Sequence, residues 1–207
     1  MIIQPIVEGH GEVGAIPVLL RRFLAEAGVH NIGVGKPIRR KRSELVQQAS
    51  VQRSVRLALL QPECGGILIV FDSDDDCPKD LAPQIKTWAK TEAGAVPCEV
   101  VMAHREYEAW FLASLEALRG VRGIVMDAAH HATPEIPRNA KGELRRHMSS
   151  GRGYSESVDQ AAMTAQMDFA AAHRGCRSFR KMVKAFGDVV SEMGVVLTPW
   201  PPGVWNA

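Results

Sequence analysis

The first half of the chain alternates short apolar runs with longer segments in which apolar residues recur at helical spacing. The clearest run is Gly66-Ile67-Leu68-Ile69-Val70-Phe71, which predicts a buried strand ending at an aspartate. Further strands are predicted over residues 2–7, 32–38 (a weaker pattern) and 98–103. Helices are predicted over residues 15–27, 43–60, 79–91 and 106–118, and Pro17 is acceptable only in the first turn of its helix. This order predicts an α/β fold with a mostly parallel sheet of four strands.

The pattern changes after residue 123. Residues 127–155 are rich in His, Pro, Arg, Gly and Ser and predict a long loop, which in proteins of this size is usually functional or flexible. Helical spacing returns over residues 157–173 and 178–193, and the segment 199–203 is expected to be extended. We therefore predict an α/β core over residues 1–123, followed by a basic loop and a helical C-terminal extension over residues 124–207 that pack on the same domain.

Composition narrows the class of protein. With 207 residues, 46% of them hydrophobic and 23% charged, the chain is expected to be an ordinary soluble protein with a substantial core. No apolar stretch approaches the roughly 18 to 20 residues of a membrane span, and no signal segment precedes the first strand, so a cytoplasmic location is expected. The four cysteines form no Cys-x-x-Cys pair, which argues against a zinc ribbon and a disulfide framework.

Acidic residues follow two of the predicted strands directly. Glu8-Gly9-His10-Gly11-Glu12 follows residues 2–7, and Asp72-Ser73-Asp74-Asp75-Asp76 follows residues 66–71. Because parallel strands end along one crevice, these carboxylates are expected to lie together, where they repel unless cations hold them. The sequence therefore predicts a divalent-metal site. The plainer interpretation is that some of these acids, Asp75 first, only favour the start of a helix.

Two more familiar motifs fit less well. Gly9-x-Gly11-x-x-Gly14 follows a strand, as in dinucleotide-binding proteins, but Glu8 and Glu12 would repel a pyrophosphate there. The aspartates from Asp72 also resemble the start of an EF-hand loop. That loop needs Gly at its sixth position and Glu at its twelfth, whereas this chain has Cys77 and Pro83.

A third acidic pair, Glu106 and Glu108, follows the predicted strand 98–103. These two residues have the same plain interpretation as acids at a helix start, but three acidic clusters at three successive strand ends favour a shared site. His10 lies between the two glycines of the first cluster and is a candidate substrate contact. His130 and His131 lack a third ligand at metal-site spacing, so we interpret them as surface residues.

The basic residues are concentrated in two blocks. One comprises Lys36, Arg39, Arg40, Lys41 and Arg42, and the other Arg138, Lys141, Arg145, Arg146 and Arg152. Either block is suited to a polyanion such as nucleic acid, although a charge run is often only a solvated surface.

A strand ending in Glu-Gly-x-Gly-Glu, followed by a hydrophobic strand ending in Asp-x-Asp, resembles the Toprim fold of topoisomerases, primases and OLD-family nucleases. The ordered set of motifs resembles more closely an uncharacterised bacterial Toprim-like domain family that is often encoded beside ATPase genes. The resemblance is carried by the segments 7–13, 71–76, 105–113 and 139–142, by Tyr154 with Asp159-Gln160, and by Ser178-Phe179. It implies a three-layer Toprim-like fold.

The resemblance also implies roles for individual residues. In nucleases of the OLD type the first Glu and the Asp-x-Asp hold divalent metal, a later acidic element completes a two-metal arrangement, and a lysine steadies charge at the scissile phosphate. Carried over, the metal ligands are Glu8, Glu12, Asp72, Asp74, Asp76, Glu106 and Glu108. The catalytic set is Glu8, Glu12, Asp72, Asp74 and Lys141, and the substrate-binding candidates are His10, Arg105, Arg138, Arg145 and Arg146.

From these observations we expect a phosphodiesterase that depends on one or two Mg²⁺ or Mn²⁺ ions and cuts DNA or RNA. The resemblance further implies an effector that works with an ATPase partner in defence against phage or plasmids. Two alternatives stay open: a non-catalytic metal-binding module of an ATPase, and a Toprim enzyme that acts on nucleotides or other phosphoesters. Nucleophilic catalysis has little support, because Ser73 has no evident general base.

Overall fold

A central parallel sheet organises the computed structural model, which describes residues 1–197 and 199–206. Its strands are β1 (Ile2–Val7), β2 (Gly33–Val34), β3 (Ile38–Arg39), β4 (Cys64–Asp72) and β5 (Cys98–Ala103). Their order is β2-β1-β4-β5, and β3 pairs with β1 beyond β2. The predicted α/β class and its mostly parallel sheet are confirmed.

The strand predicted over residues 32–38 is split into β2 and β3, so the sheet has five strands and not four. β2 pairs with Ile2 and Ile3, whereas β3 pairs with Ile6 and Val7 on the same edge of β1. Pro37 lies between the two segments and has no N–H to donate to the ladder. In the gap the side-chain amide of Gln4 donates to the carbonyl of Lys36 at 2.7 Å.

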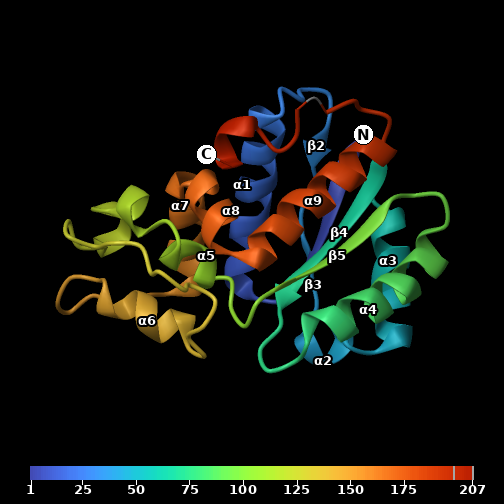
Figure 1. The fold of residues 1–207 in the computed structure, drawn as a ribbon. Helices are drawn as coiled ribbons and strands as arrows, with labels where there is room; N and C mark the ends of the chain where they lie inside the picture. Colours follow the sequence, from blue (N-terminus) through green and yellow to red (C-terminus); the bar gives the residue numbers. More distant parts are fainter. Residues whose placement is uncertain (198, 207) are drawn as a thin grey trace.

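The sheet separates two hydrophobic cores, because side chains of successive strand residues point to opposite faces. Leu68 and Val70 of β4 belong to the larger core, and Ile67, Ile69 and Phe71 to the smaller one. Along the chain, the helices between the strands are α1 (His10–Glu26), α2 (Arg42–Leu45), α3 (Gln48–Leu59) and α4 (Pro78–Ala93). α1 contributes to the larger core, while α3 and α4 pack together over the smaller one (Figure 1).

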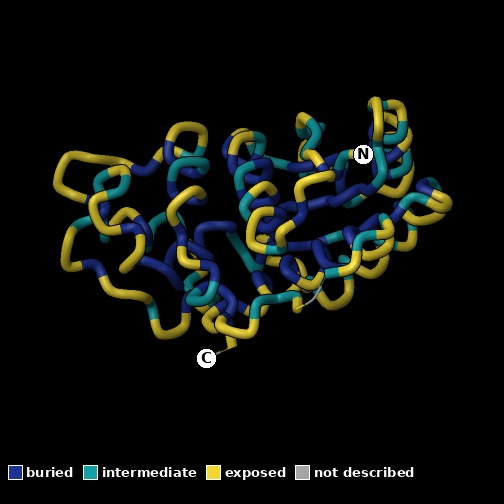
Figure 2. The backbone as a smooth tube through the Cα atoms, turned by 90° about the horizontal axis from the view of Figure 1, so that it is seen from above, coloured by how far each residue is buried: buried dark blue, intermediate teal, exposed yellow. Residues whose placement is uncertain are grey.

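The second half of the chain packs on the same side of the sheet as α1. Its helical segments are α5 (Ala109–Leu112), η1 (Leu115–Leu118), η2 (Val121–Gly123), α6 (Ala140–Arg146), α7 (Glu156–Gln166), α8 (Phe169–Gly175), α9 (Arg177–Glu192) and η3 (Gly203–Asn206). α7 lies along α1, and α9 crosses β5 and β4. Figure 2 shows buried residues through the middle of the molecule and exposed residues in its outer turns.

Several helix predictions were wrong in their bounds. α1 begins at His10 and not at Ala15, so Pro17 lies well inside the helix and leaves the carbonyl of Val13 without its usual donor. The early start has a local cause: the Glu12 carboxylate accepts the amides that precede the helix, as described below. The helix predicted over residues 43–60 is interrupted at Gln47, whose backbone is extended, although neither Gly nor Pro is present there.

The predicted loop 127–155 contains α6. Asn139 caps this helix by accepting the amide of Gly142 at 2.6 Å, and Ala140 and Leu144 are buried one turn apart. The helix predicted over residues 106–118 is reduced to α5 and η1. The one predicted over residues 157–173 breaks at Asp168, which caps α8 by accepting the amide of Ala171 at 3.0 Å.

Within residues 1–197 and 199–206, none of the helices has both the length and the apolar character that a membrane crossing requires. The division near residue 123 stays a prediction.

Candidate functional site

The candidate site lies where β1 and β4 end. After β1 the chain turns to β2 and β3 on one side, and later returns to β4 on the other side of β1. A reversal of this kind leaves a crevice at the carboxyl ends of the two central strands, the usual ligand site in open α/β sheets. Glu8 follows β1, and Asp72 is the last residue of β4.

Glu12 links the end of β1 to the start of α1. Its Oε2 accepts the backbone N–H groups of Glu8 at 3.0 Å and Gly9 at 2.5 Å. Burial raises the pKa of Glu12 to about 7, and the charges of Glu8 and Glu108 act in the same direction. Burial also raises the pKa of Glu8, whose Oε2 is buried without a hydrogen-bond partner among the described residues.

Asp72 is held by the segment after β5. Its Oδ1 accepts the backbone N–H of Tyr107 at 2.8 Å. Burial raises the pKa of Asp72 well above its usual value, and the negative charges of Glu12 and Glu108 raise it further. The carboxylates from three separate segments are therefore close enough to repel one another.

Glu108 is the most deeply buried of these acids, with 0% of its surface exposed. Its Oε1 accepts the Tyr154 hydroxyl at 2.7 Å and the Gln160 amide at 3.3 Å. Its Oε2 has no partner in the part of the chain that the structure describes. Burial raises the pKa of Glu108 to about 7, although the nearby Lys141 lowers it.

Lys141, in the first turn of α6, supplies a cation to this cluster. Its Nζ lies 3.0 Å from Glu156 Oε1 and 3.7 Å from both Asp72 Oδ2 and Glu106 Oε1. Its backbone N–H donates to the other oxygen of Glu106 at 2.9 Å. Burial acts to lower the pKa of Lys141, but the charges of Glu108, Asp72 and Glu156 outweigh it and raise the pKa.

Arg42 organises the aspartate-rich loop after β4. Its guanidinium donates to the carbonyls of Asp72 and Ser73, the latter at 2.9 Å, and pairs with Asp76. Its Nε also lies 3.2 Å from Asp74 Oδ2. Asp74 has a left-handed backbone with φ of 48°, a sparsely populated region that Asp tolerates better than most residues. Asp74 and Asp76 therefore share one arginine at the rim of the cluster.

The profile of a family described as Domain of unknown function (DUF4276) matches residues 7–186. The chain belongs to this family. Comparison with curated proteins and with solved structures gave no match. The range matched by the DUF4276 family contains every candidate residue of the site, from Glu8 after β1 to Gln160 in α7.

The structure brings most of the predicted acids together. Asp72, Glu106 and Glu108 are neighbours of Lys141, and the charge of Glu12 acts on Asp72. Glu8 feels both Lys141 and Arg42, and Arg42 pairs with Asp74 and Asp76. Asp75, which we interpreted as a residue favouring a helix start, instead pairs with Arg138 at 3.0 Å.

The predicted substrate-binding residues lie around the cluster rather than in it. His10 is exposed at the start of α1, and Arg105 donates to the carbonyl of Ile136. Arg145 and Arg146 are exposed in the last turn of α6, where Arg146 pairs with Glu143 at 2.7 Å. His130 contacts Glu116 at 2.7 Å, in keeping with its interpretation as a surface residue.

Sequence reasoning missed four residues of the site. Arg42 was recognised only as part of a basic block, and Tyr154 and Gln160 only as parts of the family resemblance. Glu156 gave no signal, because it lies far along the chain from the strand ends and in no acidic cluster. α7 reaches the site because Gly11 lets it approach α1: a Cβ there would lie 2.8 Å from the carbonyl of Glu156 and closer still to Gln160.

The clustered carboxylates are oxygen ligands of the type that binds a hard divalent cation. Among the described residues, no three His, Cys, Asp or Glu side chains are already arranged as a metal-binding group. Glu12, Asp72 and Glu106 instead accept backbone amides, and Lys141 lies between Asp72, Glu106 and Glu156. The buried, unpartnered oxygens of Glu8 and Glu108 are nevertheless carboxylate ligands of the kind that Mg²⁺ and Mn²⁺ prefer.

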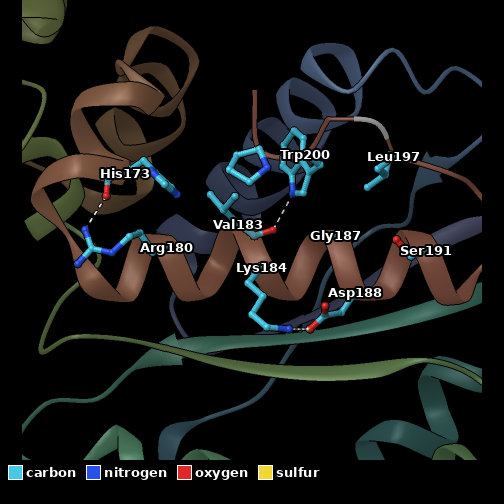
Figure 3. A pocket seen from close by; sticks show the side chains of 10 residues that line it. His173, Arg180, Val183, Lys184, Gly187, Asp188, Ser191, Leu197 and Trp200 are labelled. Carbon is cyan, nitrogen blue, oxygen red and sulfur yellow. Dashed lines mark hydrogen bonds and ion pairs between the residues drawn. The ribbon is translucent and has the colours of Figure 1, made fainter. Parts of the chain in front are cut away.

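The surface also contains two pockets. One of about 450 Å³ borders the site and is lined by Asp76, Cys77, Asp80, Leu81 and Gln84. Another of about 370 Å³ lies between α9 and the C-terminal segment, where the Trp200 indole donates to the carbonyl of Val183 at 2.9 Å (Figure 3). None of the clustered acids is among the described residues that line this second pocket, so it is separate from the candidate site.

Proposed function

We propose that this protein is a divalent-metal-dependent phosphodiesterase whose substrate is DNA or RNA. One observation carries the proposal: Glu8 and Glu108 each bury a carboxyl oxygen that has no hydrogen-bond partner among the described residues, in a cluster with Glu12 and Asp72 at the crevice of a parallel sheet. Burying several acids together is costly unless protons or cations compensate their charge. A cation site explains why the fold retains them.

The residues that would hold the ion are Glu8, Glu12 and Asp72, with Asp74, Asp76, Glu106 and Glu108 as further ligands. Bound there, a divalent ion supplies a Lewis acid that lowers the pKa of water and offsets charge on a phosphodiester. Tyr154 and the Tyr107 amide orient the carboxylates of Glu108 and Asp72, which keeps the ligands from rotating away.

The basic side chains around the cluster favour a polyanion over a small neutral substrate. Lys141 is placed to neutralise negative charge that develops on a phosphoryl group. Arg138, Arg145 and Arg146 are exposed and suit contacts to a phosphate backbone, and Arg105 and His10 flank the strand ends. For this reason we propose a nucleic acid as the substrate.

We also propose a cytoplasmic location. A further part of the proposal rests on the Toprim resemblance: we assign the protein the role of an effector that acts with an ATPase partner in defence against phage or plasmids. Both the relationship to Toprim proteins and the partnership with an ATPase are therefore proposals.

The test incubates the purified full chain with plasmid, single-stranded DNA, RNA and a nucleotide in Mg²⁺ or Mn²⁺. We expect cleavage of a nucleic acid that EDTA abolishes and that Glu8→Gln and Asp72→Asn each reduce by at least ~100-fold. Asp188→Asn, in the pocket of Figure 3, is the matched control and should retain full activity.

Other outcomes identify the alternatives. Cleavage of the nucleotide alone would assign the site to small phosphoesters. Thermal stabilisation by Mn²⁺ without cleavage of any substrate, with or without an ATPase, would favour a non-catalytic metal-binding module and overturn the proposal.

A further inference from the structure

Lys141 occupies a place in the cluster that would otherwise suit a cation. Its ammonium group lies between carboxylates from three parts of the chain: Asp72 at the end of β4, Glu106 after β5 and Glu156 at the start of α7. The separations are 3.0 Å to Glu156 and 3.7 Å to each of the others. With the side chain only 25% exposed, these contacts are largely screened from bulk water.

The backbone holds Lys141 in this place. Glu106 accepts the Lys141 amide with one oxygen and faces its ammonium group with the other. Asn139 fixes the same turn by accepting the amide of Gly142. The lysine is therefore anchored at both its backbone and its side chain, unlike a surface lysine that samples many rotamers.

The unpartnered oxygens belong to different residues. They are Oε2 of Glu8 and Oε2 of Glu108, and neither residue forms an ion pair with Lys141 in the described part of the chain. The cluster thus has one side where Lys141 forms ion pairs with three carboxylates, and another side where Glu8 and Glu108 each keep a buried oxygen that no described residue contacts by a hydrogen bond. Asp72 adjoins both, since its Oδ2 faces Lys141 while Glu12 and Glu108 raise its pKa.

We propose that the Lys141 ammonium group is the second cation of this centre, filling the position between Asp72, Glu106 and Glu156, so that each chain takes one divalent ion. This inference rests on the proposed function, since it concerns the number of ions in the same site. It replaces the two-ion arrangement that the Toprim resemblance implies. A second divalent ion at Asp72 and Glu106 would have to displace the lysine, because two cations that share the same carboxylates repel each other.

The test counts ions bound to the metal-free full chain, using electron paramagnetic resonance of free Mn²⁺ together with titration calorimetry. The wild type should bind one Mn²⁺ per chain. Lys141→Ala should bind two, because it exposes three carboxylates without a cation. Lys181→Ala, an exposed residue on α9, is the control and should bind one. Lys141→Met, which keeps the aliphatic stem, should match Lys141→Ala and guards against a folding defect in the smaller variant.

A double variant locates the added ion. Lys141→Ala combined with Glu156→Gln should weaken binding of the second Mn²⁺ by at least tenfold and leave the first unchanged. Two ions in the wild type, or one in both Lys141 variants, would overturn the inference. Neither result would affect the proposed function, which fails separately if the wild type binds one Mn²⁺ and cuts nothing. A wild type that binds no Mn²⁺ would overturn both the inference and the proposed function.

Discussion

Glu108 shows how a single buried acid depends on its donors. It is fully buried, it receives hydrogen bonds from Tyr154 and Gln160, and one of its oxygens receives none from any described residue. Hydrogen bonds to a charged group contribute more to stability than those between neutral groups, at about 1.5–3 against 0.5–1.5 kcal/mol. The hydrogen bond from the Tyr154 hydroxyl to Glu108 should therefore contribute more to the free energy of unfolding than a hydrogen bond between neutral groups.

We predict that Tyr154→Phe lowers the free energy of unfolding by ~1.5–3 kcal/mol in EDTA at pH 8, where Glu108 is largely ionised. Urea denaturation gives this value directly. Tyr107→Phe is the matched control, because it also removes a buried hydroxyl, whose partner at 3.0 Å is the neutral Thr164. A loss for Tyr154→Phe no larger than that for Tyr107→Phe would show that Glu108 does not depend on this donor.

For individual residues, the sequence indicated which acids belong to the site but not which groups they contact. Spacing after the strands placed Glu8, Asp72 and Glu108 near one another, since parallel strands end along one edge. It did not reveal that Glu12 would accept two backbone amides, because that contact depends on where α1 begins. Nor did it reveal Glu156, which lies 15 positions after Lys141 in the chain and contacts it only through the packing of α7.

Among the elements, the strands were predicted best. β1 and β5 have the predicted bounds, and β4 agrees within one or two residues at its ends, because buried parallel strands are continuous apolar runs. The short helices were predicted worst. α6 buries only Ala140 and Leu144, so its periodicity is too brief to stand out from the Gly, Ser and Arg residues around it.

The conformation of the loop after β4 depends on contacts with Arg42 of α2. Asp74 donates its amide to the carbonyl of Arg105 at 3.1 Å, and Asp76 donates its own to Ser73 at 2.9 Å. Arg42, at the first residue of α2, contacts two carbonyls and two carboxylates of this loop. Lysine cannot replace such a planar, multiply donating group, because its ammonium is a single point charge.

We predict that Arg42→Lys speeds hydrogen exchange at the amides of Asp74 and Asp76 by about tenfold, equivalent to ~1.4 kcal/mol of local stability. The measurement is peptide-level exchange followed by mass spectrometry. Arg53→Lys, on the exposed face of α3, controls for the loss of any guanidinium. Equal exchange in the wild type and Arg42→Lys would mean that the backbone hydrogen bonds alone order the loop.

Over the whole molecule, the two halves of the chain share one core. Phe23 of α1 contacts five aromatic rings from the second half, with centroids 4.9–6.2 Å away: Phe169, Phe179, Phe186, Trp200 and Trp205. α9 covers the face of β5 and β4, and α7 lies along α1. The same helices and α6 bring Lys141, Tyr154 and Glu156 to the carboxylates, so packing and site assembly depend on the same contacts.

We therefore predict that residues 1–123 alone do not form a cooperative fold, even though they contain the whole sheet. Without the second half, Phe23 and the face of the sheet under α9 are exposed to water, and burying one such aromatic side chain contributes ~3–5 kcal/mol. The fragment should bind a hydrophobic dye and unfold without a sharp urea transition. Coexpression with residues 124–207 should restore both the transition and Mn²⁺ binding. A sharp transition for the fragment alone would instead make the second half an appendage to an independent domain.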